Sequence, residues 1–460
     1  MQLPWEHRNS MLAIDMETAC AKLLKNEFLT LVSGLAERMG VKAYFVGGGL
    51  RDVLIGREMK DFDFVLSGAF EELPSKFAEE VQGTFFWLDR QRFQSRVVAR
   101  HNGDNFVFDF AALRGCDISQ DLQLRDFTIN ALALLLAVEQ GQVLDPCDGL
   151  GDLSQGVIRA CHGDSFDDDP LRLLRALRFS AVLGFSIEPE TWRKIREKAS
   201  LLRKVAPERI REEFFKILEM PDAGTALERV YESGLLTEII PFCFGPEENN
   251  RTREGQGINK VHEVESVICE TGRFSPDEGK QIRDYLSSEV ESGVTIASLM
   301  KLALLLCENE IAQATVKVVA GKLRLGCKSR RFLEILGREA RPVLAESGRK
   351  LTERAMYRFF KDREPAGLAV LIIALARKSL HGETCFRITS YYFKEYPNVR
   401  EETLLSGEEI MNLLGIGPGI KVGEVMECLR NAESMGLVNS KKEARDFLGK
   451  NMLTKDEAVI

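Results

Sequence analysis

The sequence predicts an α+β protein in which a head with a mixed β-sheet is followed by a long all-α part. Two observations lead to this fold class. Between about residues 43 and 145, short segments rich in β-branched and aromatic residues alternate with turn-forming residues, which is the pattern of strands. After about residue 165 that pattern ends, and apolar residues recur at helical spacing. A chain of 460 residues also exceeds one ordinary hydrophobic core, so we expect several domains.

The expected elements follow in chain order. Residues 16–40 carry apolar side chains at helical spacing, and Gly40 is a residue type that ends helices. Strands are expected at residues 43–48, 62–67, 84–89, 96–100 and 105–113, and helices at 169–185, 189–205 and 207–218. We divide the chain into an N-terminal helical extension (1–40), a head (41–163), a helical neck (164–225), a helical body (226–390) and a helical tail (391–460).

Composition and charge narrow the class of protein. Hydrophobic residues make up 45% of the chain and charged residues 29%, which is ordinary for a soluble globular protein. No apolar run is long enough to span a membrane and no secretory pattern opens the chain, so we expect a cytoplasmic protein without a membrane partner. The ten cysteines include no CxxC pair, which argues against a zinc site or a disulfide framework. No obligatory protein partner is inferred.

Two basic clusters stand out in a chain whose net charge is −8. Residues 192–211 and 321–331 are dense in arginine and lysine, and neutralisation of phosphates dominates the affinity of proteins for RNA. The predicted RNA contacts are Arg203, Lys204, Arg209, Lys322, Arg324 and Lys328. The alternative is that each cluster is only a solvated helix face.

The stretch 44-YFVGGGLRDVLIGREMKDFDFV-65 carries the first candidate site. Asp61 and Asp63 are two residues apart in an expected strand, so both carboxylates point to one face and can share a pair of Mg²⁺ ions. The glycines, with Gly47 and Gly48 as candidate nucleotide contacts, allow close approach of a triphosphate, and Arg51 can donate to its oxygens. A solvated strand edge is the alternative. Asp109, on a neighbouring expected strand, is a candidate third catalytic carboxylate.

A second candidate site lies on the helix expected after residue 168. Its charged residues recur at three- and four-residue steps and therefore share one flank: Asp168, Asp169, Arg172, Arg175 and Arg178. Cytosine and adenine both present an amine donor beside a ring-nitrogen acceptor, so Asp169 as acceptor and Arg172 as donor can select these two bases without a template. A ladder of salt bridges within the helix is the alternative.

Five motifs in order resemble those of class II tRNA nucleotidyltransferases and bacterial poly(A) polymerases, which belong to the DNA polymerase beta superfamily. They are VGGGLRD…GREMKDFDFV (46–65), LRDFTINALAL (124–134), DPCDGLGDLSQGVIR (145–159), DDPLRLLRALRFSAVLGF (168–185) and PERIREEFFKIL (207–218). The resemblance implies a Mg²⁺-dependent enzyme with a two-metal site. Such an enzyme adds C and A from CTP and ATP to the 3′ end of tRNA and releases pyrophosphate.

The resemblance also implies roles for the second motif. Arg125 and Asn130 would hold the triphosphate or ribose and Asp126 would orient the site, whereas the alternative is a helix cap and a surface ion pair. The chain departs from the family at Leu124, where a second arginine is usual, and at Asp168, where glutamate is usual. Both departures leave the choice of nucleotide open. A further departure places Leu50 where a valine often precedes the arginine.

Several alternatives stay open at this stage. A poly(A) polymerase shares the head motifs, and addition of only CC or only the terminal A is compatible with the two departures. A non-catalytic RNA-binding relative would not need both metal carboxylates, and a small-molecule nucleotidyltransferase would not be expected to carry the D-D-P-L-R helix. His262 has no adjacent aspartate, so we do not expect the metal-dependent phosphohydrolase domain that some relatives carry.

Overall fold

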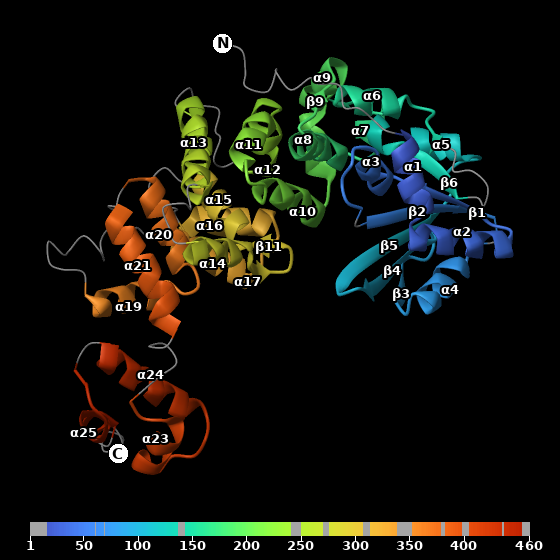
Figure 1. Cartoon of the computed structure of the whole chain (residues 1–460). Helices are drawn as coiled ribbons and strands as arrows, with labels where there is room; N and C mark the ends of the chain where they lie inside the picture. The colour runs from blue at the N-terminus through green and yellow to red at the C-terminus, as the bar shows by residue number, and fades with distance from the viewer. Residues whose placement is uncertain are drawn as a thin grey trace. The chain divides into compact units, whose positions relative to one another are not determined.

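The computed structural model describes residues 16–59, 61–68, 70–136, 143–240, 250–269, 276–306, 313–337, 352–378, 382–397, 404–434 and 437–452. The chain forms two compact units (Figure 1). The first comprises Met1–Ile217 and Arg229–Ile239, and the second comprises Leu218–Glu228 and Ile240–Ile460. The expected boundary between head and neck falls inside the first unit, and the division into five parts stays a prediction. The α+β fold class is confirmed.

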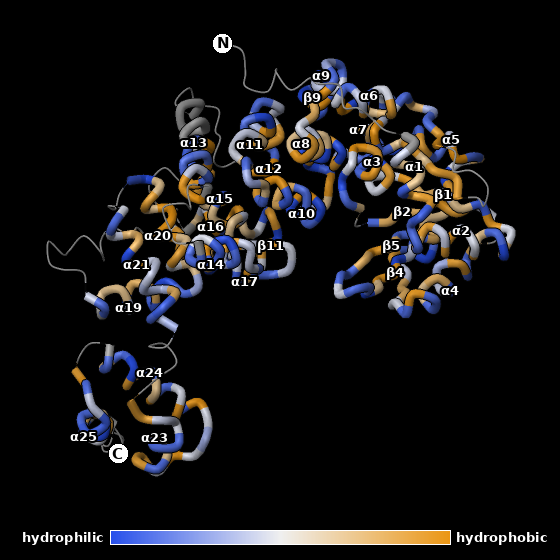
Figure 2. The backbone as a smooth tube through the Cα atoms, in the orientation of Figure 1, coloured by the Kyte–Doolittle hydropathy of each residue, from blue (hydrophilic) through white to orange (hydrophobic). Residues whose placement is uncertain are grey.

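The head is built on a seven-stranded sheet in the order β3-β4-β5-β2-β1-β6-β7. The strands are β1 Lys42–Val46, β2 Asp61–Ser67, β3 Thr84–Asp89, β4 Gln94–His101, β5 Asp104–Ala112, β6 Ala133–Leu136 and β7 Val143–Leu144. Only the pair β2 and β5 is parallel within this sheet, so the predicted mixed sheet is confirmed. Hydrophobic residues dominate the strands near its centre (Figure 2).

Alternation along β2 separates a core face from a site face. Phe62 and Phe64 are buried, and their rings lie 4.9 Å from those of Phe108 and Phe110 on β5. Helices α2 (Glu27–Met39) and α4 (Leu73–Glu80) cover this aromatic layer, because Phe28 and Phe77 reach Phe108 at 4.9 and 4.8 Å. Asp61 and Asp63 therefore point to the opposite face of the sheet.

The N-terminal helix prediction is wrong in one respect. Residues 16–40 form two helices, α1 (Met16–Leu24) and α2, because the Asn26 side chain accepts hydrogen bonds from the N–H groups of Phe28 and Leu29 and so caps α2. Gly40 ends α2 in the left-handed conformation at φ 65°, as predicted.

The remainder of the first unit is mostly helical. It contains α3 Gly48–Leu54, α5 Ile118–Gln123, the 3₁₀ helix η1 Thr128–Asn130, α6 Gly149–Gln155, α7 Ser165–Asp168, α8 Leu171–Leu183, α9 Pro189–Lys198, the 3₁₀ helix η2 Ala199–Lys204, α10 Pro207–Leu218 and α12 Leu235–Ile239. Prolines open α9 and α10, as predicted. A two-stranded parallel sheet of β8 (Val157–Ile158) and β9 (Ser186–Ile187) was not predicted, since such short strands carry no periodic signal.

The second unit is helical apart from one short hairpin of β10 (Glu289–Glu291) and β11 (Val294–Thr295) among the described residues. Its helices are α13 Asn250–Cys269, α14 Pro276–Ser287, α15 Ile296–Leu306, α16 Gln313–Lys322, α17 Cys327–Leu336, α19 Glu353–Lys361, α20 Gly367–Ala376, α21 Gly382–Lys394, α23 Gly407–Leu414, α24 Ile420–Ser434 and α25 Lys441–Met452, and α11 Ala223–Glu232 crosses the boundary between the units. Helices α15 and α20 consist mostly of apolar residues, and almost all of their residues are buried. Among the described helices none is long and apolar enough to cross a membrane.

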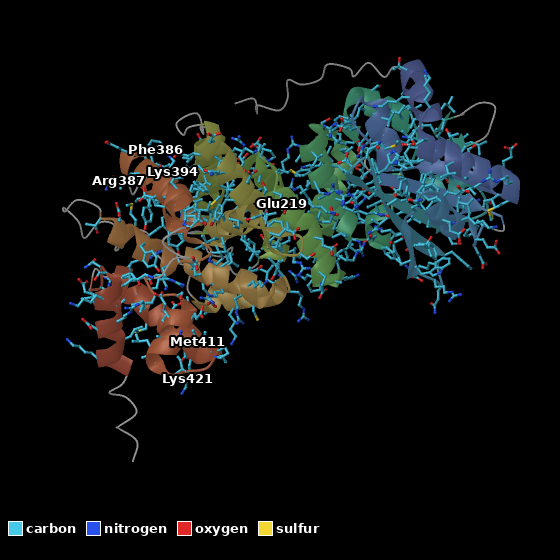
Figure 3. All side chains as sticks on the ribbon, turned by 60° about the horizontal axis from the view of Figure 1, so that its bottom comes forward. Glu219, Phe386, Arg387, Lys394, Met411 and Lys421 are labelled. Carbon is cyan, nitrogen blue, oxygen red and sulfur yellow. The ribbon has the colours of Figure 1, made fainter. Side chains whose placement is uncertain are left out.

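Surface side chains of this unit pair between helices. Lys394 on α21, labelled in Figure 3, lies 3.3 Å from Glu278 on α14. The tail helices α23 to α25 enclose a small core of their own around Ile410, Val425 and Leu429. Gly415 ends α23 in the left-handed conformation at φ 64°, and a short glycine-rich loop then leads into α24.

Candidate active site

A cavity of about 560 Å³ opens in the first unit beside the site face of β2. Most of the predicted catalytic and nucleotide-binding residues line it: Gly47, Gly48, Arg51, Asp61, Asp63, Arg125, Asp126, Asn130, Arg175 and Arg178. Segments far apart in the sequence, from β1 to α8, therefore meet at one place. The other four predicted residues, Asp109, Asp168, Asp169 and Arg172, are not part of this lining.

One wall is formed by the glycine-rich turn of residues 47–49, which leads from β1 into the first turn of α3. Gly47 has φ 77° and ψ −145°, a conformation that is open only to glycine. A Cβ atom on Gly49 would lie 2.5 Å from the carbonyl oxygen of Asp61 and 2.8 Å from Cζ of Phe45, whereas one on Gly48 would meet nothing closer than 3.4 Å. The backbone of this turn therefore packs directly against β2, the strand that carries the candidate metal ligands Asp61 and Asp63.

Asp61 and Asp63 form the acidic part of the wall. Burial raises the pKa of Asp63 to about 6; the charge of Arg125 opposes this shift, and the neighbouring Asp109 and Asp61 reinforce it. Crowded carboxylates of this kind fit a divalent cation, which would relieve their repulsion and accept hard oxygen ligands.

Asp109 lies opposite Asp63 in the parallel register of β2 and β5. Its two carboxylate oxygens accept from Nε and Nη2 of Arg96 at 2.7 and 2.8 Å. Arg96 is its direct cross-strand neighbour on β4. A catalytic role for Asp109 stays a prediction.

A hydrogen-bond chain links the glycine-rich turn to α8. Nη1 of Arg51 donates to Oδ1 of Asn130 at 2.7 Å, and Nδ2 of Asn130 donates to Oδ1 of Asp126 at 3.1 Å. Arg175 closes the chain by donating from Nε and Nη2 to Oδ2 of Asp126 at 3.0 and 2.7 Å. Burial alone would raise the pKa of Asp126, but Arg175 and these hydrogen bonds hold it below its usual value. The carboxylate is therefore an ionised anchor for the site.

Three guanidinium groups surround the ring of Phe179 on α8. Arg51, Arg175 and Arg178 lie 5.1, 5.2 and 4.1 Å from its centroid. Since like charges repel, a cluster of three arginines at a cavity wall favours an anionic ligand. Cations on one wall and carboxylates on the other match a metal-bound triphosphate.

Two buried carboxylates that pair with arginines of the cavity were not predicted from the sequence. Glu213 on α10 accepts from Nε of Arg178 at 2.6 Å and lies 3.7 Å from Nη1 of Arg175. Asp121 on α5 accepts from Nε and Nη2 of Arg125, both at 3.2 Å. The i,i+4 spacing of Asp121 and Arg125 is a sequence signal that could have identified Asp121. Glu213 lies within the predicted neck motif, but its pairing with arginines was not predicted.

The predicted base-reading pair lies at the corner between α7 and α8. Asp169 accepts from Nη2 and Nη1 of Arg209 at 2.8 and 3.3 Å. Arg172 donates to the carbonyl oxygen of Leu124 at 2.8 Å and to Oγ of Ser165 at 2.8 Å. The unusual Leu124 thus contributes its backbone, and its side chain is 41% exposed. Asp168 is half exposed, and Oδ2 lies 3.3 Å from Nε2 of His162.

Comparison with known proteins identifies the family. The CC-adding tRNA nucleotidyltransferase of Geobacter sulfurreducens is 38% identical over 430 residues, which cover 94% of this chain and 96% of that protein. The chain belongs to the tRNA nucleotidyltransferase family. It is accordingly a nucleotidyltransferase, and the resemblance seen in the sequence is confirmed. The A-adding tRNA nucleotidyltransferase of Deinococcus radiodurans is 30% identical, with 88% of this chain and 94% of that protein covered.

Family models and solved structures agree with this assignment. Residues 43–159 match the poly A polymerase head domain, and residues 184–244 match the probable RNA and SrmB-binding site of polymerase A. A CCA-adding enzyme solved in complex with ATP has the same fold, with a TM-score of 0.67 over 95% of this chain and 96% of that one at 22% identity. The head domain and the segment that follows it are therefore family features.

The predicted RNA contacts of this nucleotidyltransferase lie on both units. In the first unit Arg203 pairs with Glu238, Arg209 pairs with Asp169, and Lys204 is exposed. In the second unit Lys322 ends α16 and Arg324 follows it, while Lys328 lines a cavity of about 630 Å³ with Arg331 and Tyr285. Their contact with RNA stays a prediction.

One further group of possible metal ligands exists among the described residues: Asp222, His262 and Glu265. Glu265 is buried, accepts from the N–H groups of Ala223 and Gly224 at 2.8 and 3.1 Å, and lies 2.7 Å from Nζ of Lys301. These contacts cap the start of α11 and neutralise the carboxylate. These contacts give Glu265 a structural role, and the expectation about His262 stays a prediction.

Proposed function

We propose that this enzyme adds two C residues to the 3′ end of tRNA from CTP, with release of pyrophosphate. The observation that carries the proposal is the single cavity in which Asp61, Asp63 and the glycine-rich turn face a wall of arginines. The choice of CC rests on relatives. CC-adding enzymes match nearly the whole chain at 38% identity in Geobacter sulfurreducens and 29% in Synechocystis.

Asp61 and Asp63 would hold the divalent metal, and the proposal takes it to be Mg²⁺ in a two-metal arrangement. When bound, such ions lower the charge of the triphosphate and favour the deprotonated 3′-hydroxyl. Hard carboxylate oxygens two residues apart on one strand suit this cation. Burial, which raises the pKa of Asp63 to about 6, removes water from its carboxylate, and a bound cation would balance the charge of that carboxylate.

The other wall of the cavity would bind the triphosphate. Arg125, Arg175 and Arg178 supply positive charge, and Asp121 and Glu213 fix their positions. The RNA 3′-hydroxyl attacks the α-phosphate of CTP in line, and the bond to pyrophosphate breaks. Positioning and preorganised charge supply most of such a rate acceleration, since phosphoryl transfer needs little covalent help from the protein.

Asp169 and Arg172 would select the nucleotide by its base edge. The Asp169 carboxylate accepts from the cytosine amine, and Arg172 donates to the neighbouring ring nitrogen and carbonyl. Uracil presents a carbonyl where cytosine has its amine, so a carboxylate repels it. This pair accepts adenine as well as cytosine, so it leaves A addition as the second candidate, which the relative from Deinococcus radiodurans also favours.

The tRNA would bind through the basic segments. From Lys317 to Arg331 the chain carries six arginines and lysines and no acidic residue, on and between α16 and α17. We propose that Lys322, Arg324 and Lys328 in this segment contact RNA phosphates, with Lys204 doing so in the first unit. The proposed partners are the tRNA 3′ end and CTP, with no obligatory protein partner, in the cytoplasm.

Product sequencing tests the proposal. The purified protein is incubated with Mg²⁺ and with tRNAs that end at the discriminator base, at C and at CC, and an unstructured RNA serves as control. CTP and ATP are supplied separately and together. The proposal expects two C residues on the first tRNA, one on the second and none on the third. Addition of A to the third tRNA would shift the assignment to CCA or A addition, and long A tracts on unstructured RNA would shift it to poly(A) synthesis.

A further inference from the structure

Arg209 was expected to bind RNA, but in the structure its guanidinium donates hydrogen bonds to the carboxylate of Asp169, the predicted base-reading residue. Its Nη2 lies 2.8 Å from Oδ2 of Asp169 and its Nη1 lies 3.3 Å from Oδ1. The two residues are 40 positions apart in the chain, so α10 has to pack against the corner between α7 and α8 for them to meet. One planar guanidinium thus holds both oxygens of one carboxylate, which fixes the plane of that carboxylate.

The corner gives Asp169 little other support. Its backbone is extended, at φ −145° and ψ 97°, between the end of α7 and the start of α8. The N–H group of Leu171 donates to Oδ1 at 3.2 Å, which holds one oxygen only. Among the described residues, Oδ2 accepts its hydrogen bond from Nη2 of Arg209. Arg209 therefore decides how Oδ2 faces an incoming base.

The partner in base reading is held in a parallel way. Nη1 of Arg172 donates to Oγ of Ser165 and Nη2 donates to the carbonyl oxygen of Leu124, both at 2.8 Å. Each member of the pair is thus oriented by a residue that does not itself read the base. Preorganisation of this kind lowers the cost of binding the correct nucleotide.

We propose that Arg209 is a positioning residue for nucleotide selection, which acts by holding the Asp169 carboxylate in the orientation that accepts an amine donor. The inference rests on the proposed function, because it deepens the role given there to Asp169. A carboxylate accepts up to four hydrogen bonds, so Oδ2 can keep its contact with Arg209 while it accepts from the amine of cytosine. Without the guanidinium, only the N–H group of Leu171 holds Oδ1, and the plane of the carboxylate is no longer fixed by a second contact.

Arg203 supplies a matched control. It is also an exposed arginine of the neck, and its Nε and Nη2 hold Glu238 at 2.5 and 3.0 Å. Arg203→Ala therefore removes the same charge and the same type of ion pair, away from Asp169. Any effect on RNA affinity or stability that comes from charge alone should appear equally in both variants.

The experiment measures kcat, KM and nucleotide preference for the wild type, Arg209→Ala, Arg209→Lys and Arg203→Ala on a tRNA that ends at the discriminator base. In Arg209→Ala we expect the preference for CTP over UTP to fall by about tenfold or more, the effect of one charge-assisted hydrogen bond. The rise in KM for CTP should exceed the fall in kcat. Arg209→Lys, which keeps the charge but not the fork, should also lose preference, whereas Arg203→Ala should keep it.

A double variant separates a positioning role from a structural one. If Arg209 acts through Asp169, the variant with both Arg209→Ala and Asp169→Asn discriminates no worse than Asp169→Asn alone. Wild-type preference in Arg209→Ala, or a loss confined to tRNA affinity, would overturn the inference. Additive losses in the double variant would overturn it as well. A wild-type protein that incorporates no nucleotide would instead refute the proposed function.

Discussion

Replacement of Gly49 by alanine tests how the glycine-rich turn supports the acidic strand. An added Cβ would lie 2.5 Å from the carbonyl oxygen of Asp61, a backbone atom, and 2.8 Å from Cζ of the buried Phe45. Neither neighbour can swing away as the end of an exposed side chain could. Strand β2, which carries the candidate metal ligands Asp61 and Asp63, must therefore shift. We expect Gly49→Ala to lower both the stability of the protein and its rate of nucleotide incorporation.

The size of the loss follows from overpacking in a core. Inserted methyl groups of this kind cost about 1–3 kcal/mol. For a unit of this size each kcal/mol lowers the melting temperature by roughly 2–4 °C, so Gly49→Ala should melt about 2–12 °C lower. Circular dichroism, recorded while the protein is heated, measures this shift in melting temperature. The rate of CTP incorporation into tRNA should fall more than stability alone explains, because a displacement of about 1 Å at reacting groups costs roughly 100-fold.

Gly48→Ala is the matched control for that experiment. A Cβ at Gly48 would meet only the Arg51 guanidinium, at 3.4 Å, and that side chain can adjust. The melting temperature of Gly48→Ala should therefore stay near the wild-type value. Equal melting temperatures and rates for the two alanine variants would refute the packing argument.

Three further predictions concern charged groups. Asp61→Ala should abolish nucleotide incorporation and leave tRNA affinity, measured by filter binding, within a few fold of the wild type. Because the pKa of Asp63 is raised to about 6, metal binding should weaken as pH falls through 6, and Asp63→Asn should remove that pH dependence in a Mn²⁺ titration. The same shift means that Asp63 binds a proton more tightly in the folded state, so its contribution stabilises the metal-free protein as pH falls from 7 towards 4. Glu213→Ala should cost about 3–5 kcal/mol in urea unfolding, since it removes the buried carboxylate that pairs with the partly buried Arg178, whereas the exposed neighbour Glu212→Ala should cost little.

The head was predictable because its signals are local. Strands β1 to β5 follow short runs of aromatic and β-branched residues, and the alternation of β2 correctly placed Asp61 and Asp63 on one face. The break at Asn26 was also encoded locally, in a side chain that caps α2, but the continuous apolar periodicity around it masked the signal.

The contacts of the site were much less predictable. Whether Asp109 faces the cavity or pairs with Arg96 depends on the register of β4 against β5, which sequence periodicity does not determine. Glu213 and Arg209 reach α8 and Asp169 only because α10 packs there, across 35 to 40 residues of chain. Residue type and spacing therefore identified the chemistry, while the partners of each arginine required the tertiary structure.

A crystal structure with tRNA, Mg²⁺ and a non-hydrolysable CTP analogue tests the account most directly. The account predicts metal on the carboxylates of Asp61 and Asp63, the triphosphate against Arg125 and Arg175, and the cytosine amine within hydrogen-bond distance of Asp169. A metal bound elsewhere, or a cytosine whose amine is out of reach of Asp169, would contradict it.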